Sequence, residues 1–172
     1  MPRRYRIEIV RRFDAETEEL AGLRKLLVSS DAGAPAPFAE GRASRIFVLE
    51  DVSPGGATDA DLRDLAATLL CDTVREDFTV NEPPASSDPY VLVARKWGVN
   101  DPVLNCLQEQ IAVRQLALRA VSRGTRLSFP ELVASPAEVL RALFRSSANP
   151  VVDQAAWNSE APLSPPRPHP GA

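Results

Sequence analysis

LLCDTVREDFTVN at residues 69–81 determines how the chain is organised, because SSANPVVDQAAWN at residues 146–158 follows the same pattern. Upstream lies a second pair of similar segments, VRRFD at residues 10–14 and ARKWG at residues 94–98. Internal repeats are sought before any other signal, because overlooking one leads to the wrong fold. The sequence therefore predicts two copies of one small module, paired within a single chain.

The chain has 172 residues, of which 44% are hydrophobic and 25% are charged, close to the average of globular domains. Its formal net charge of -3 argues against a nucleic-acid-binding surface, which needs clustered positive charge. The first residues lack an apolar run of signal-peptide type, and no segment approaches the ~20 apolar residues of a membrane span. We therefore expect a cytoplasmic protein that binds neither nucleic acid nor membranes.

Hydrophobic periodicity separates the chain into strands and helices. Apolar residues alternate with polar ones, or run together, in six segments that we expect to be strands: residues 5–9, 45–49, 78–80, 90–94, 118–129 and 151–157. Four helices are expected to begin at residues whose side chains can cap a helix: Asp14, Thr58, Asp101 and Ser135. Each half of the chain thus follows the order strand, helix, strand, helix, strand.

Two expected strands, residues 46–49 and 90–94, are apolar on both faces, so both faces of their sheets must be covered. Helices cover one face, and the simplest cover for the other is the second half of the chain. We therefore expect an α+β protein in which two tandem β-α-β-α-β modules pack sheet to sheet as a pseudo-dimer, with the helices outside. The modules would span residues 1–82 and 89–158, with a linker at 83–88 and a Pro-rich, disordered tail at 159–172.

Residues able to carry catalysis are few and scattered. The single histidine, His169, lies in the Pro-rich tail, where it cannot be oriented for a Ser-His-Asp or Cys-His mechanism. Cys71 and Cys106 lack metal-ligand spacing and are expected to be small buried hydrophobic residues. Trp97 is either a core residue or, if exposed beside Gly98, part of a contact site. The sequence therefore predicts no catalytic, metal-binding or cofactor-binding residue.

Several short motifs occur together in one known family. KWGVNDP at residues 96–102 is similar to its Lys-Pro-Gly-Val-x-Asp turn, with Trp97 in place of proline. LLCDTV at 69–74 and ANPVV at 148–152 are similar to its Leu-Leu-x-Asp/Asn-Pro-Val motifs, and LRAVSRGTR at 118–126 is similar to one of its strands. Together these segments resemble PurS, the small subunit of phosphoribosylformylglycinamidine synthase in purine biosynthesis. The resemblance covers residues 5–158 and extends to the tandem PurS-like N-terminal region of the fused enzymes.

The resemblance implies a non-catalytic accessory subunit, or N-terminal region, of this synthase. In the family, formylglycinamide ribonucleotide, glutamine and ATP give the amidine, ADP, phosphate and glutamate, and the PurS element supports the synthetase–glutaminase complex and ammonia transfer. The implied partners are a synthetase subunit of the PurL type and a glutaminase subunit of the PurQ type, and no cofactor is implied. The residues that match family motifs, and are candidates for partner contact, are Lys96, Trp97, Gly98, Val99, Asp101, Arg123, Gly124, Asn149 and Pro150.

A tandem ACT-like module that senses a small metabolite is the alternative. Its basis is the duplicated α+β pattern together with two glycine-bearing turns, at residues 53–56 and 97–100. The ligand would bind between the two halves of the chain. The two hypotheses differ in what should bind, which is a protein subunit in the first and an amino acid or nucleotide in the second.

Overall fold

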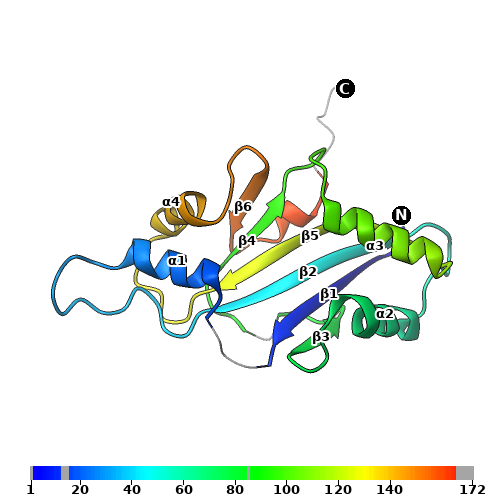
Figure 1. Cartoon of the computed structure of the whole chain (residues 1–172), viewed down its shortest axis with the longest axis horizontal. Helices are drawn as coiled ribbons and strands as arrows, with labels where there is room; N and C mark the ends of the chain where they lie inside the picture. The colour runs from blue at the N-terminus through cyan, green and yellow to red at the C-terminus, as the bar shows by residue number, and fades with distance from the viewer. Residues whose placement is uncertain (1, 13–15, 85, 166–172) are drawn as a thin grey trace.

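The computed structural model describes residues 2–12, 16–84 and 86–165, and in these residues six antiparallel strands form one sheet in the order β3-β1-β2-β5-β4-β6 (Figure 1). The strands are β1 (Arg4–Arg11), β2 (Arg42–Asp51), β3 (Glu76–Val80), β4 (Tyr90–Arg95), β5 (Leu118–Ser128) and β6 (Asp153–Trp157). The helices are α1 (Glu18–Leu27), α2 (Asp59–Leu65), α3 (Pro102–Val113) and α4 (Pro136–Ser146). A π-helical turn, η1 (Ala66–Leu70), continues α2, and a 3-10 turn, η2 (Ala161–Leu163), follows β6. The expected α+β class is confirmed.

Side-chain caps fix where the helices begin. Thr58 and Ser135 each start a capping box, in which the cap hydroxyl accepts from a backbone N–H three residues on and an acidic side chain reaches back. Asp101 caps α3 as expected, with Pro102 at the first helical position. The expected first cap is wrong: Thr17 caps α1, and Asp14 lies outside the described residues.

The repeat seen in the sequence is also present in the hydrogen bonds. Asn81 and Asn158 directly follow the last strand of their halves, and both have positive φ, 58° and 46°. Asn81 donates its backbone N–H to the carbonyl of Arg6, and its side-chain oxygen accepts from the Arg6 N–H. Asn158 makes the same two bonds with Tyr90. The first half (β1 to β3) and the second half (β4 to β6) therefore share this hydrogen-bond pattern. Equivalent positions are separated by 84 residues at Arg6 and Tyr90 and by 77 residues at the two asparagines.

The expected packing of the two halves sheet to sheet is wrong. The halves join edge to edge instead, because β2 pairs with β5 over the whole length of β2, from the pair Arg42 and Ser128 to the pair Asp51 and Leu118. These are the longest strands, 10 and 11 residues, and an unpaired edge of that length would expose a row of backbone donors and acceptors. Pairing them satisfies both edges and produces one continuous sheet.

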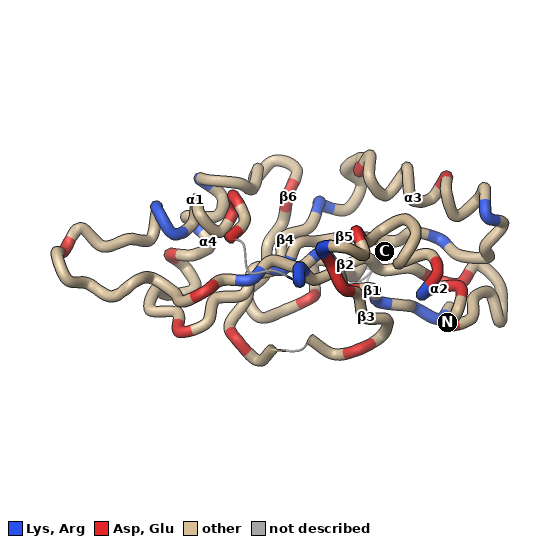
Figure 2. The backbone as a smooth tube through the Cα atoms, turned by 60° about the horizontal axis from the view of Figure 1, so that its bottom comes forward, with Lys and Arg blue, Asp and Glu red and all other residues tan. Residues whose placement is uncertain are grey.

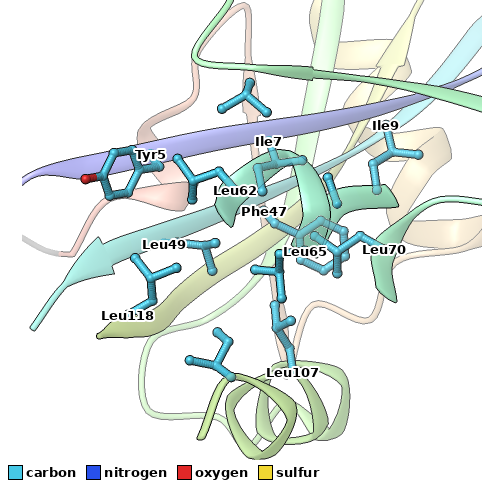
Figure 3. Packing of buried hydrophobic residues seen from close by; sticks show 13 residues of the cluster. Tyr5, Ile7, Ile9, Phe47, Leu49, Leu62, Leu65, Leu70, Leu107 and Leu118 are labelled. Atoms are coloured by element: carbon cyan, nitrogen blue, oxygen red, sulfur yellow. The ribbon is translucent and has the colours of Figure 1, made fainter. Parts of the chain in front are cut away.

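All four helices lie on the same face of this sheet, and the halves exchange helices. In one core, Leu107 and Ile111 of α3, from the second half, pack with β1, β2 and α2 of the first half (Figure 3). In the other core, Leu20 and Leu23 of α1, from the first half, pack with β4, β5 and α4 of the second. Each core therefore contains side chains from both halves, so neither half has a complete core of its own.

The opposite face of the sheet is covered by the segment that follows β6. Leu163 is only 3% exposed and packs on Ile46, Leu92 and Ala94, and the Arg6 guanidinium binds the Glu160 carboxylate with a shortest distance of 2.7 Å. The expectation of a disordered tail is therefore wrong for residues 159–165, because this segment supplies the cover that strands apolar on both faces need. Residues 166–172, including His169, lie outside the described residues.

Candidate partner-contact site

Six of the nine candidate residues gather at the turn between β4 and α3, which we call the contact turn (residues 96–101), and at the neighbouring Arg123 of β5. The Val99 N–H donates to the Lys96 carbonyl at 3.1 Å, which closes the turn. Gly98 has a φ of 84°, a conformation that side chains other than glycine rarely adopt. The Lys-x-Gly-Val sequence therefore sets the shape of the turn and leaves Trp97 at its tip.

An ion pair with a buried carboxylate anchors the far end of the contact turn. Asp101 is 5% exposed, and its carboxylate accepts from the backbone N–H groups of Val103 and Leu104 as the cap of α3. Both of its oxygens also accept from Nε of Arg123, at 3.0 and 2.9 Å. A buried carboxylate is tolerated only when its charge and its lone pairs are satisfied, and these four contacts do so. The start of α3 is thereby tied to β5.

The Asn149–Pro150 motif lies beside the contact turn. The backbone N–H of Lys96 donates to the Val152 carbonyl at 2.8 Å, and the Lys96 ammonium donates to the Pro150 carbonyl. The side-chain oxygen of Asn149 accepts from the N–H of Val151, which holds the loop between α4 and β6 in its tight form. Asn149 and Pro150 therefore brace the contact turn from the side.

The same loop geometry occurs in the first half. The side chain of Asp72 accepts from the N–H of Val74, and its backbone carbonyl accepts from the N–H of Glu76. Asn149 accepts in the same two ways from the N–H groups of Val151 and Asp153. The two segments that resemble the Leu-Leu-x-Asp/Asn-Pro-Val motif, LLCDTV and ANPVV, are thus turn-forming sequences. Their similarity explains why the repeat is detectable there.

Gly124 does not belong to the contact turn. It lies in the middle of β5, on the face covered by the segment after β6. A Cβ at this position would lie 2.9 Å from the Val93 carbonyl oxygen and 3.1 Å from a methyl of Leu163. The glycine is needed for close packing under Leu163, so its assignment to a contact site is not supported by its position.

Apolar side chains are exposed around the contact turn. Trp97 is 38% exposed, so the interpretation of Trp97 as a core residue is wrong. Val103, in the first turn of α3, and Val52, after β2, are exposed as well. Two hollows flank the turn: one of about 170 Å³ between Trp97 and Arg123, and one of about 680 Å³ between Val52 and α3. The turn therefore presents an indole on a rigid, uneven surface.

The second glycine-bearing turn, residues 53–56, borders a hollow of about 520 Å³. The Tyr5 hydroxyl donates to Oδ2 of Asp51 at 2.9 Å, while Oδ1 of Asp51 is buried and has no hydrogen-bond partner among the described residues. Burial and the Asp51 carboxylate raise the pKa of Tyr5. The pair could not be predicted from the sequence, because residues 46 positions apart give no local signal.

Charged residues of both signs are interspersed along the sheet and helices rather than separated (Figure 2). Within the described residues, no group of three or more His, Cys, Asp or Glu side chains is placed to hold a metal ion. The described helices are all too short or too polar to cross a bilayer. Cys106 is exposed, contrary to expectation, and Cys71 is partly buried, which raises the pKa of its thiol.

Comparisons with known proteins return no match among protein-family models, among curated proteins or among solved structures. The resemblance to PurS therefore rests on the short motifs and on the repeat. Of the motif residues, those of the contact turn, Arg123, Asn149 and Pro150 form one continuous cluster, and Gly124 lies apart from it.

Proposed function

We propose that the chain is a non-catalytic accessory subunit, or N-terminal region, of a phosphoribosylformylglycinamidine synthase. It would bind the synthetase and glutaminase subunits and support their complex and the transfer of ammonia between them. The observation that carries this proposal is the contact turn, where the residues that resemble PurS lie together and expose Trp97. The duplicated module supports it as well, because the fused enzymes of the family carry two such modules in tandem.

The physical argument for binding is the rigidity of an exposed indole. Tryptophan dominates many interfaces because it supplies a large contact area at a small cost in conformational entropy. Here the backbone on both sides of Trp97 is fixed, by Lys96 against the Asn149–Pro150 loop and by Asp101 against Arg123. A partner would therefore meet a preformed surface.

Light scattering coupled to size-exclusion chromatography tests the proposal. The chain is mixed with the synthetase from its own source, with and without the glutaminase, glutamine and ADP. We expect a complex, and we expect Trp97→Ala to weaken it by about tenfold or more, as truncation of an interface tryptophan does. Val113→Ala, at the far end of α3, is the matched control and should leave binding unchanged. A chain that stays alone under every condition would contradict the proposal.

Metabolite sensing by an ACT-like module is the second candidate function. It is favoured by Oδ1 of Asp51, which is buried, has no hydrogen-bond donor among the described residues and belongs to a residue lining the 520 Å³ hollow. The residues that line this hollow all come from the first half, so the site differs from the expected one between the two halves. A ligand with an N–H donor, such as an amino acid, would satisfy it. A thermal shift of several degrees with an amino acid or nucleotide, absent in Asp51→Asn and accompanied by no binding of the synthetase, would favour this function.

A further inference from the structure

A groove lies between α4 and the loop that follows α1, and Pro150, which braces the contact turn, is the one contact-site residue in its lining. We call it the α4 groove; its volume is about 1070 Å³. Its apolar lining includes Leu26, Leu27, Val28, Val133, Leu140 and Phe144. Leu26, Val28 and Val133 are exposed, with 45%, 60% and 64% of their surface accessible. Exposed apolar side chains gathered in a hollow are typical of an interaction site.

The walls of the α4 groove are fixed by hydrogen bonds. The N–H of Val133 donates to the Pro37 carbonyl at 2.9 Å, which joins the loop after α1 to the loop before α4. The Arg24 guanidinium donates to the carbonyls of Phe38 and Ala39, at 2.7 and 2.8 Å, and lies over the Phe38 ring. The groove is therefore formed before any partner binds, which lowers the entropy cost of binding.

Two arginines on α4 give the groove its charge. Arg141 and Arg145 line it one helical turn apart, so their side chains share a face of the helix. Neither forms an ion pair with a carboxylate of the described residues. The acidic residue of the lining, Glu138, is engaged in the capping box of α4, where hydrogen bonds from Ser135 lower its pKa. Glu138 therefore stays negatively charged, and the two arginines outnumber this one carboxylate in the lining of the groove.

We propose that the α4 groove binds an acidic amphipathic helix of a partner protein. The apolar residues of such a helix, at positions i, i+3 or i+4 and i+7, would fill the groove, and carboxylates four residues apart would meet Arg141 and Arg145. The lining combines exposed apolar side chains with two arginines four residues apart, and this combination matches an amphipathic helix that carries acidic residues. Leu140 and Phe144 are half-buried in the hollow, so a flat bilayer surface would not reach them.

Fluorescence anisotropy with a labelled helical peptide of about 14 residues tests this proposal. One peptide carries leucines at the anchor positions and glutamates beside them, and a second carries lysines in place of the glutamates. We expect the acidic peptide to bind about tenfold more tightly than the basic one, with an affinity that falls as salt rises. The double variant Arg141→Glu and Arg145→Glu should reverse this preference, because the charges then match the basic peptide.

Matched controls separate this surface from the contact turn. Arg11→Glu with Arg75→Glu makes the same change in net charge at positions outside the groove lining, and it should leave peptide binding unchanged. Val133→Asp changes an exposed groove residue and should weaken binding of the acidic peptide. Equal binding of both peptides, no binding of either, or binding only to phosphatidylglycerol vesicles would overturn the proposal. Trp97→Ala should leave peptide binding unchanged. Loss of binding to the synthetase can therefore be distinguished from loss of peptide binding in the α4 groove.

Discussion

Leu107→Ala is expected to destabilise the whole chain, although Leu107 belongs to the second half and packs in the core beneath the first. Leu107 is 5% exposed in a core that also contains residues of β1, β2 and α2 (Figure 3). Replacing a buried leucine by alanine costs about 3 kcal/mol, the sum of the lost transfer free energy and the cavity left behind. With a urea m-value of about 2 kcal/mol/M, the unfolding midpoint should fall by about 1.5 M.

The assay uses a tryptophan that reports on the other core. In a Trp97→Phe background, Trp157 is the remaining tryptophan, and it stacks on Phe129 with ring centroids 6.2 Å apart. Phe129 and Trp157 belong to the core that contains α1 and α4, not to the core of Leu107. We expect Trp157 fluorescence and far-ultraviolet circular dichroism to shift together by the full amount, because helix exchange and the β2–β5 pairing make unfolding cooperative.

Two observations check the reasoning. Val113→Ala, on the same helix but 76% exposed, should change the free energy of unfolding by less than about 0.5 kcal/mol. If Leu107→Ala moves the circular dichroism transition while Trp157 unfolds at its original urea concentration, the two cores unfold separately. That result would refute the conclusion that the halves depend on each other.

Further predictions concern glycines, a buried carboxylate and a helix cap. Gly124→Ala should destabilise the chain by about 1–3 kcal/mol, because the added methyl overpacks the space under Leu163. Gly22→Ala should stabilise the chain by about 0.5–1 kcal/mol, because Gly22 lies in α1 and an added Cβ would meet its neighbours at ordinary contact distances. Urea unfolding of both variants measures the difference. In the folded chain the pKa of Glu50 is lowered, chiefly by the hydrogen bond that it accepts from Arg4. Ionised Glu50 therefore stabilises the fold at pH values above the pKa of a glutamate in the unfolded chain, and this stabilisation is lost as the pH falls through the lower pKa of the folded chain. Glu50→Gln should therefore destabilise the chain at pH 7, and the difference in unfolding midpoint from the parent should shrink below about pH 4.5. Ser135→Ala should cost about 1 kcal/mol and lower the melting temperature, because it removes the capping box of α4.

Local features of the fold could be predicted from the sequence because their causes are local. The capping boxes at Thr58 and Ser135 and the cap at Asp101 follow from side chains that reach backbone groups two or three residues away. The pairing of β2 with β5 could not be predicted in this way. Apolar alternation shows that a strand has a buried face, but it does not show which other strand lies at its edge.

The candidate site was predictable to the extent that its residues are close in sequence. The contact turn is one continuous motif, so its residues were certain to lie together. Gly124 was misassigned because a glycine in a strand can mark a bend, a ligand site or the close approach of a neighbouring segment, and the sequence does not distinguish these cases. Its neighbour Leu163 is 39 positions away in a segment whose proline content predicted disorder, although that segment is packed on the sheet.

The two copies differ at the position that anchors the contact turn, and this difference supports a specialised role for the second copy. Thr17 caps α1 as Asp101 caps α3, 84 residues later. Strand register makes Ala43 the first-half counterpart of Arg123. Arg6 pairs with Val48 and its counterpart Tyr90 pairs with Ser128, so positions in β2 and β5 correspond at an offset of 80 residues. The first copy therefore caps its helix with a neutral hydroxyl and has no ion pair at this position.

A helix start thus needs only a cap, which the first copy makes without burying charge. Burying Asp101 and half-burying Arg123 in the second copy carries a desolvation cost that a threonine and an alanine avoid. The ion pair does, however, fix the contact turn against β5, and the turn exposes Trp97. Under the proposed function, the first copy completes the sheet and the exchanged cores, while the second copy would also hold a rigid surface for a partner. If so, replacing Asp101 by Thr and Arg123 by Ala together should preserve the fold and weaken partner binding as Trp97→Ala does.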